Sequence, residues 1–271
     1  MMTHAFKATG LPSFSLLFLL SWLFPGVMEA QEGGRLTFQD LMQVRQIQQP
    51  SISPDGAWVA LAAVPDRGDG EVLVYSSDGG TRYSVPMGSG PVISADGLWV
   101  GMRLGPSFEA RETVEGGDPP RPALALLDTR SGEVTTWEEV RRFAFSGDGR
   151  WLARHLYAPE EEAESPGEGE PGEEETEGES PRTREEPGTT LVLREMSSGA
   201  ELELPHVDRF SFDSSGSWLA FVVASPGGGG DGVFVRRLEL DEAPLELDAF
   251  PFAHVESLQW WSEGPPVSYT H

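Results

Sequence analysis

The stretch Ile52-Ser-Pro-Asp-Gly-Ala-Trp-Val-Ala60 recurs three more times along the chain. Each copy reads apolar residue, Ser or Asp, turn residues, Gly, any residue, Trp, apolar residue, small residue. The other copies lie at 93–101, 145–153 and 212–220, and 261–267 is a weaker fifth copy. Asp-Gly is typical of a tight β-hairpin turn, because glycine adopts positive φ angles without steric cost. The pattern predicts hairpins with a two-residue turn, in which Trp begins the returning strand.

The spacing of these copies predicts the architecture. The turn glycines Gly56, Gly97, Gly149 and Gly216 are separated by 41, 52 and 67 residues. The shortest interval sets a repeat of about 40 to 45 residues, which is typical of a propeller blade when the repeat contains only strands. Helical solenoids of this period would show helical periodicity, which the sequence lacks.

A second recurring element lies between the Trp hairpins. It reads as a buried strand, a turn and an exposed strand, at 72–80, 124–134, 191–199 and 233–240. Two hairpins in each repeat make four strands, which is one blade. We therefore predict an all-β chain whose residues 50–271 form about four to five four-stranded blades of a β-propeller.

The first 30 residues have the organisation of a signal peptide. Lys7 is followed by an apolar run over 11–24, and Pro25-Gly26 precedes Ala30 at a plausible cleavage point. The run is short for a membrane span and is interrupted by Pro12. We expect export to the periplasm or the medium without stable membrane insertion, and an uncleaved membrane anchor is the alternative.

Charge and cysteine content exclude several classes of function. The formal net charge is −25, which argues against nucleic-acid binding, because such binding relies on clustered Lys and Arg. The chain contains no cysteine, so thiol catalysis and cysteine-ligated zinc are excluded, and stability must come from burial and strand pairing.

Residues 31–49 read as a leader helix before the first blade. Thr37 can cap it, and Phe38, Leu41 and Val44 share one face. Gln49-Pro50 would end it. Two interpretations stay open, a helix that caps the first blade and a linker to a partner domain.

Two insertions lengthen the longer intervals. Residues 105–122 carry charged side chains among Gly and Pro and read as an elongated loop, either solvated or lining a substrate path. Residues 159–188 consist almost entirely of Glu, Gly, Pro, Ser and Thr. This tract cannot bury enough apolar surface to offset its ordering entropy, so we expect disorder, and it lacks the spacing of a calcium loop.

No residue qualifies as catalytic, cofactor-binding or metal-binding, and no cofactor is expected. The histidines lack metal-ligand spacing, Gly-x-Ser-x-Gly is absent, and Gly227–Gly230 reads as a hairpin loop. His155 follows the strand that begins at Trp151, which favours a blade residue over a base. A Trp at a fixed position in every repeat favours packing between blades, and carbohydrate binding is the alternative.

The start of the predicted propeller resembles a known family. The leader Leu36-Thr-x-x-Asp-Leu41, followed by Pro50-x-Ile-Ser-Pro-Asp-Gly-x-Trp-Val-Ala60, looks like the start of exported bacterial peptidases of the prolyl oligopeptidase family. In that family a β-propeller precedes an α/β-hydrolase domain with a Ser, Asp and His triad. No residue of this chain matches the triad motif, and Glu138-Glu139 does not match the glutamate pair of the family's dipeptidyl peptidases. The resemblance extends over 36–267.

The resemblance implies a function for the whole protein. We expect the chain to be the front part of a seven- or eight-bladed propeller that covers a serine peptidase site and filters peptides, without catalysis of its own. Its partner would be a peptide substrate held by a hydrolase domain outside the chain. TolB-like propellers share the Ser-Pro-Asp-Gly repeat, so a periplasmic protein-binding propeller is the alternative. A complete five-bladed propeller acting on glycans is disfavoured, because no carboxylate pair stands out.

Overall fold

The structure is a computed structural model that describes residues 42–113, 120–159, 184, 186–239, 242–252, 255–261 and the backbone of 267–270. All of these residues belong to the larger of two units, Phe38–His271, and the other unit is Met1–Thr37. The predicted signal peptide and residues 31–41 of the predicted leader helix lie outside the described residues.

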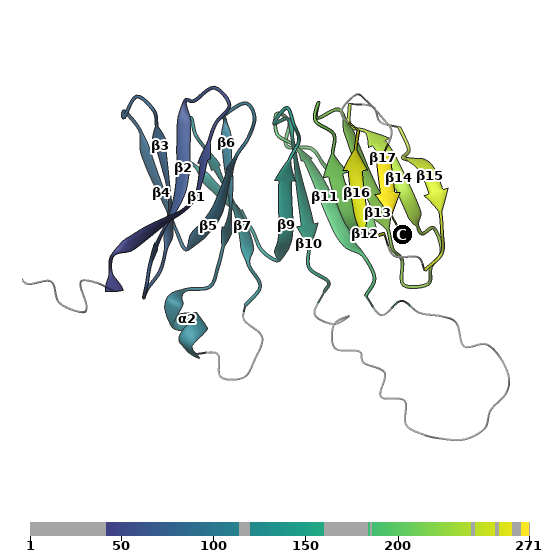
Figure 1. Cartoon of the computed structure of the whole chain (residues 1–271), viewed down its shortest axis with the longest axis horizontal. Helices are drawn as coiled ribbons and strands as arrows, with labels where there is room; N and C mark the ends of the chain where they lie inside the picture. Colours follow the sequence, from purple (N-terminus) through teal and green to yellow (C-terminus); the bar gives the residue numbers. More distant parts are fainter. Residues whose placement is uncertain are drawn as a thin grey trace, which may run out of the picture. The chain divides into compact units, whose positions relative to one another are not determined.

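The first two blades are separate four-stranded antiparallel sheets whose strands follow one another in chain order. Blade one consists of β1 (Arg45–Ile52), β2 (Trp58–Pro65), β3 (Glu71–Ser76) and β4 (Arg82–Pro86). Blade two consists of β5 (Gly88–Ile93), β6 (Trp99–Leu104), β7 (Ala123–Asp128) and β8 (Val134–Trp137). Figure 1 shows these sheets side by side, and β5 contacts β1, β2 and β3.

The next two blades share one long strand, β12 (Glu201–Phe212), within a seven-stranded sheet. Residues 201–204 of β12 pair with β11 and close blade three, and residues 207–212 pair with β13 and open blade four. The other strands of this sheet are β9 (Val140–Phe145), β10 (Trp151–Leu156), β11 (Thr189–Glu195), β13 (Trp218–Val223), β14 (Gly232–Arg237) and β15 (Leu245–Ala249). A further hairpin, β16 (Ser257–Trp260) and β17 (Val267–Thr270), follows. The predicted all-β propeller architecture is thus confirmed.

Trp begins β2, β6, β10 and β13, as the repeat predicts. The turn before it is longer than predicted, because the Ser53 amide donates to the Trp58 carbonyl at 3.0 Å and leaves four residues in the loop. Within the loop the Trp58 amide donates to Ser53 Oγ at 2.9 Å, and that hydroxyl donates to the Asp55 carboxylate at 2.6 Å. The side chains of the motif therefore satisfy the loop's own amides, which is the turn chemistry of Ser and Asp. Only the glycine, Gly56, has a positive φ, of 71°.

The Asp-Gly turns of successive blades contact one another. A Cβ atom on Gly97 would lie 3.7 Å from the Asp55 carboxylate, and one on Gly149 would lie 3.1 Å from Asp96 Oδ1. On Gly216 it would lie 2.4 Å from Asp148 Oδ1. The recurring glycine therefore serves two purposes, a positive φ in its own loop and close approach to the preceding blade.

The small residue that ends each motif is buried where blades pack. The four positions are Ala60, Gly101, Ala153 and Ala220. These residues lie on the side of the sheet that packs against large side chains. A Cβ atom on Gly101 would lie only 2.6 Å from the Phe143 ring of blade three. The core consists of such interblade clusters of Val, Leu, Ala and aromatic side chains.

The connections between blades repeat an unusual backbone conformation. Met87, Glu139, His206 and Phe252 have positive φ angles of 56–61°, and each lies where one blade passes to the next. The carbonyl groups of the first three accept hydrogen bonds from the amides of Gly105, Tyr157 and Ala224. A positive φ is costly for a residue with a side chain, so these bonds hold the crossover in place.

Three local predictions are corrected. Residues 45–49, predicted as the end of a helix, lie in β1, where residues 45–48 pair with β2 and continue the sheet. The predicted loop 105–122 contains a short helix, α2 (Phe108–Thr113), whose Ala110 amide is capped by Ser107 Oγ at 3.1 Å.

The third correction concerns the acidic insertion 159–188, of which residues 160–183 and 185 lie outside the described residues. Arg184 and Gly188, which the prediction placed in a disordered tract, contact blade four. The Arg184 guanidinium lies 2.7 Å from Asp231, and the Gly188 amide donates to Ala224 at 2.8 Å.

Candidate binding pocket between blades three and four

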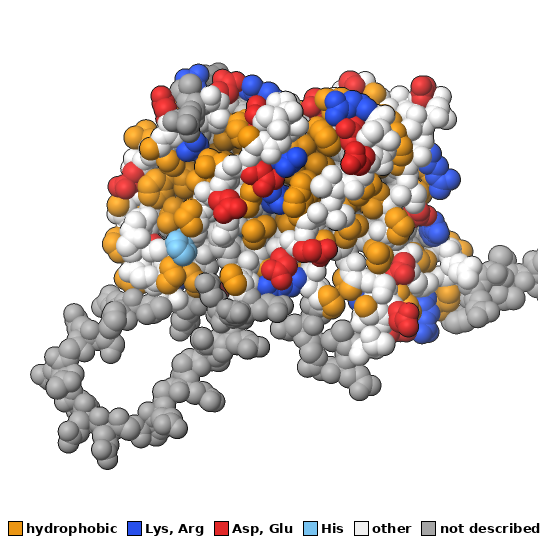
Figure 2. Space-filling view, turned by 180° about the vertical axis from the view of Figure 1, so that it is seen from behind, with side chains coloured by type: hydrophobic (Ala, Val, Ile, Leu, Met, Phe, Trp, Pro, Cys, Tyr) orange, Lys and Arg blue, Asp and Glu red, His pale blue; other side chains and the backbone are white. Residues whose placement is uncertain are grey.

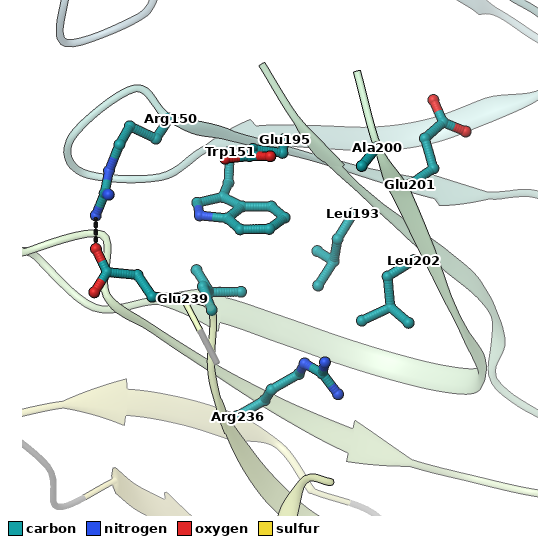
Figure 3. Close-up of a pocket in the computed structure, with 10 residues that line it drawn as sticks. Arg150, Trp151, Leu193, Glu195, Ala200, Glu201, Leu202, Arg236 and Glu239 are labelled. Atoms are coloured by element: carbon teal, nitrogen blue, oxygen red, sulfur yellow. Dashed lines mark ion pairs between the residues drawn. The ribbon is translucent and has the colours of Figure 1, made fainter. Parts of the chain in front are cut away.

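A pocket of about 580 Å³ lies where blade three meets blade four. Its apolar lining combines Trp151 of β10, Leu193 of β11, Leu202 of β12 and Leu238, which follows β14. Figure 3 shows the Trp151 ring and the Leu193 and Leu202 side chains directed into the same space. Leu193 and Leu238 are buried, whereas Trp151 and Leu202 are half-buried and border the space. The volume falls within the range of small-molecule sites.

Charged side chains surround this apolar lining. Arg150 pairs across the blade boundary with Glu239 at 2.7 Å, the ion pair drawn in Figure 3. Arg150 also contacts Asp148 at 2.5 Å. Burial raises the pKa of the Asp148 carboxyl, but hydrogen bonds from Ser146 and Arg150 outweigh it and hold that pKa below its usual range. The Asp148 carboxylate therefore remains charged at neutral pH.

Glu201, at another edge of the pocket, joins two arginines. Arg154 lies 2.7 Å and Arg194 lies 2.9 Å from the same Glu201 oxygen, Oε1. Both guanidinium groups also lie over the Trp137 ring, with Arg154 4.5 Å from the ring centroid. Burial lowers the pKa of the Arg154 guanidinium, and the Glu201 carboxylate opposes this shift. The Arg154 and Glu201 side chains thus support one wall of the pocket.

Figure 2 shows that acidic and basic side chains are interspersed with hydrophobic ones on the face it displays. The large negative net charge is therefore not gathered into a single acidic surface there.

The repeated tryptophans are packing residues, as their fixed position in every repeat predicts. Trp58, Trp99 and Trp151 are half-buried and pack against the core clusters. Trp58 also stacks on Tyr83, with ring centroids 6.0 Å apart, and Arg237 lies over Trp218. Trp151 has a second property, since part of its ring also borders the pocket.

His155 is a blade residue, as its position after Trp151 predicts. It lies in β10, is buried, and its Nε2 atom is 2.8 Å from the carbonyl oxygen of Val207. Its ring meets Phe210 edge-on at 5.9 Å. Burial lowers the pKa of this imidazole, which favours the neutral form in a packing role.

Other groups considered in the sequence are separate from the pocket. Glu138 and Glu139 are exposed at the connection between β8 and β9, and Arg121 lies 3.6 Å from Glu139. Gly227–Gly230 connects β13 to β14, as predicted. Asp231 beside it is buried and accepts hydrogen bonds from the Ser225 and Phe252 amides.

Within the described part of the chain, no group of three or more His, Asp or Glu side chains could hold a metal ion. Over the same residues, none of the helices reaches the length and hydropathy needed to cross a membrane.

The pocket could not be predicted from the sequence. It arises from which residues of neighbouring strands face each other, and that depends on strand register. The β11–β12 pairing includes an irregularity between Thr189 and Leu191 that no sequence motif marks. No signal in the sequence marks the pocket, because Tyr83 of blade one and Leu202 of blade three are matched only by strand register.

Comparison with known proteins supports the fold. No family model and no curated protein matches the chain. A solved structure of a eukaryotic initiation factor is similar over 83% of this chain and 49% of its own, at 15% identity and a TM-score of 0.53. A prolyl endopeptidase structure is similar over 83% of this chain and 32% of its own, at 12% identity and a TM-score of 0.49. The β-propeller domain of the Trilobed protease from Pyrococcus furiosus is similar over 76% of this chain and 58% of its own, at 11% identity and a TM-score of 0.44.

At these identities the likeness shows the fold alone, that of a β-propeller. Propellers of prolyl oligopeptidase and acylaminoacyl peptidase structures are among the neighbours, at low sequence identity. The chain spans about half the length of the initiation factor chain and about a third of the prolyl endopeptidase chain.

Proposed function

We propose that this chain is the N-terminal propeller portion of an exported prolyl-oligopeptidase-like serine peptidase, acting in the periplasm or the medium. The observation that carries the proposal is the peptidase-like motif over 36–60, whose described part coincides with the first blade. Residues from Arg45 onward form β1 and β2, and Ser53 and Trp58 of the motif close the loop between them. The described part of the motif therefore forms a hairpin of the first blade, which is compatible with the sequence resemblance.

The role of this portion is to cover the peptidase site and admit short peptides. Blades of a propeller surround a central channel, and such a ring of sheets restricts access by size. The catalytic groups would be supplied by a hydrolase domain outside this chain, so the chain alone has no peptidase activity. Its substrate partner is a peptide, bound by the whole protein.

The test is to express the whole reading frame that contains this chain and to assay short chromogenic peptides. We expect hydrolysis that a serine-directed fluorophosphonate abolishes, with a preference for short peptides over folded proteins. A soluble product without hydrolysis or labelling would contradict the proposal.

The second candidate is a binding propeller of the TolB kind, without enzymatic activity. The specific observation in its favour is the pocket beside Trp151, since a half-buried aromatic side chain in a concave site is typical of protein recognition. Pull-down of a defined periplasmic partner by a frame that never labels would favour this candidate.

A further inference from the structure

The blades share a register, so equivalent positions can be compared directly. In blade one Ala60 pairs with Val74, and Val74 pairs with Tyr83. In blade three the same steps lead from Ala153 through Leu193 to Leu202. Tyr83 and Leu202 therefore occupy equivalent positions on the outermost strands of their blades.

Between blades one and two, Tyr83 fills the interblade space. Its ring stacks on Trp58 at an interplanar angle of 22°, and its hydroxyl donates to the Thr129 carbonyl of blade two at 3.0 Å. A Cβ atom on Gly132 would lie 2.5 Å from the Tyr83 ring, so the ring is closely enclosed. The space between two blades can therefore hold a tyrosine ring that stacks on Trp and donates its hydroxyl hydrogen bond to a carbonyl group of the next blade.

Between blades two and three the equivalent position is Thr135, reached from Gly101 through Leu126. There the Met196 side chain of blade three packs against the cluster that contains Trp99. That interface is therefore occupied from the following blade.

Between blades three and four, Leu202 leaves the space unfilled. Leu238 corresponds to Thr129, because each donates its amide to the loop residue before Trp, at 2.9 Å to Ser217 and 3.0 Å to Leu98. Trp151 corresponds to Trp58, since each begins the second strand of its blade. Leu238 and Trp151 are thus the counterparts of the polar and aromatic partners of Tyr83. No tyrosine ring lies between them, because the position equivalent to Tyr83 is a leucine.

We propose that this pocket binds a tyrosine side chain presented by a partner polypeptide. The ring stacks on Trp151 as Tyr83 stacks on Trp58, and the phenol hydroxyl donates a hydrogen bond to the Leu238 carbonyl. At about 580 Å³ the pocket also has room for the peptide groups on either side of that residue.

The charged side chains at the pocket edge are paired with one another. Glu201 lies against Arg154 and Arg194, and Arg150 lies against Glu239. The proposal therefore concerns the tyrosine side chain alone and not the charge of its flanking residues. Every residue that lines the pocket belongs to blades three and four, so the proposal does not rest on the peptidase-like motif over 36–60.

The test is a titration of the full chain with N-acetyl-tyrosinamide, N-acetyl-phenylalaninamide and N-acetyl-leucinamide, followed by the NMR signals of the Trp151 indole and the Leu193 methyls. We expect saturable shifts with the tyrosine probe and about fivefold weaker binding of the phenylalanine probe, which lacks one hydrogen bond. The leucine probe should bind more weakly still, because it cannot stack.

Two matched variants test the assignment. Leu202→Tyr should fill the pocket, raise the melting temperature and abolish the shifts. Tyr83→Leu should open the equivalent space in blade one and add a second set of shifts at Trp58. If Leu202→Tyr does not fold, Ala200→Trp, at an exposed lining residue, should block the pocket without changing the core.

Equal binding of the three probes, or shifts that persist in the blocked variant, would overturn the proposal. A wild-type dimer that Leu202→Tyr converts to a monomer, with no probe binding to either, would also overturn it, because a second copy would then occupy the pocket.

Discussion

The hydroxyl of Tyr83 in blade one donates a hydrogen bond to the carbonyl oxygen of Thr129 in blade two, across 3.0 Å. This bond joins the outermost strand of one blade to a turn of the next. Tyr83 therefore contributes to the blade interface through both its ring and its polar end.

Removing that hydroxyl should weaken the interface. Tyr83→Phe is expected to lower the free energy of unfolding by about 1 kcal/mol, the usual net value of one hydrogen bond. Tyr83→Leu should cost about 2 to 4 kcal/mol, because it also leaves a cavity. Urea denaturation measures both. The control is Tyr75→Phe, which keeps the ring beneath Arg82, and a loss as large as that of Tyr83→Phe would contradict the role of the Thr129 bond.

The Asp-Gly turns of successive blades contact one another. The substitution of the turn glycine by alanine should therefore lower stability by different amounts in different blades. Gly56→Ala and Gly216→Ala both place Ala at a positive φ, of 71° and 76°, and each should cost about 1 to 2 kcal/mol for that reason. At Gly56 no atom lies within 4 Å of the added Cβ, whereas at Gly216 the Asp148 side chain lies 2.4 Å away.

Gly216→Ala should therefore cost about 1 to 3 kcal/mol more than Gly56→Ala, the usual penalty of overpacking. Thermal unfolding of both variants under one condition would show the difference. Equal melting temperatures would mean that the turns of blades three and four do not depend on close approach.

The carboxyl of Asp231 should stabilise blade four. Burial raises its pKa, but hydrogen bonds from the Ser225 amide, Arg184 and the Phe252 amide lower it by more. A carboxyl with a lowered pKa stabilises the fold above about pH 3.9 and loses that contribution as the pH falls through its folded value. Asp231→Ala should cost about 3 to 5 kcal/mol at neutral pH, because it removes the buried carboxylate that pairs with Arg184 and accepts hydrogen bonds from the Ser225 and Phe252 amides.

The matched control for this variant is Asp66→Ala, at an exposed side chain that accepts one hydrogen bond from Gln46. It should change stability by less than about 0.5 kcal/mol. Stability of the Asp231→Ala variant should also depend less on pH below 4 than that of the wild type, and unchanged acid sensitivity would contradict the assignment.

The buried His155 side chain should make a second pH-dependent contribution to folding stability, at higher pH than that of Asp231. Burial lowers its pKa below the value of about 6.5 for an unfolded histidine. The folded state therefore loses stability as the pH falls from about 6.5 toward the folded pKa of this imidazole. In His155→Gln, which can still donate to Val207, this loss should disappear. Denaturation at a series of pH values checks it, and an unchanged slope between pH 6.5 and 5 would count against burial of a neutral imidazole.

Much of the fold could be predicted from sequence because its motif is local. Ser53, Asp55, Gly56 and Trp58 satisfy one another within one loop, so their spacing alone reports the hairpin and its repetition reports the blade. The predicted two-residue turn was wrong because the Ser and Trp backbone groups pair with each other and enclose four residues.

Features that depend on neighbours could not be predicted in this way. Residues 45–49 directly follow the helical spacing of Phe38, Leu41 and Val44, yet pairing with β2 places them in a strand. Leu202 and Tyr83 look unrelated in sequence, and only the register of two successive strand pairs makes them equivalent. The pocket arises because Leu202 leaves unfilled the space that Tyr83 fills in blade one. It is therefore recognised only when the blades are compared in space.

We propose that this chain is the propeller portion of a serine peptidase. Fluorophosphonate labelling of the product of the whole reading frame, with the labelled residue identified by mass spectrometry, tests this proposal. We expect labelling of one serine within Gly-x-Ser-x-Gly, on a domain that follows this chain. A reading frame that stops at His271, with a soluble product that never labels, would contradict it.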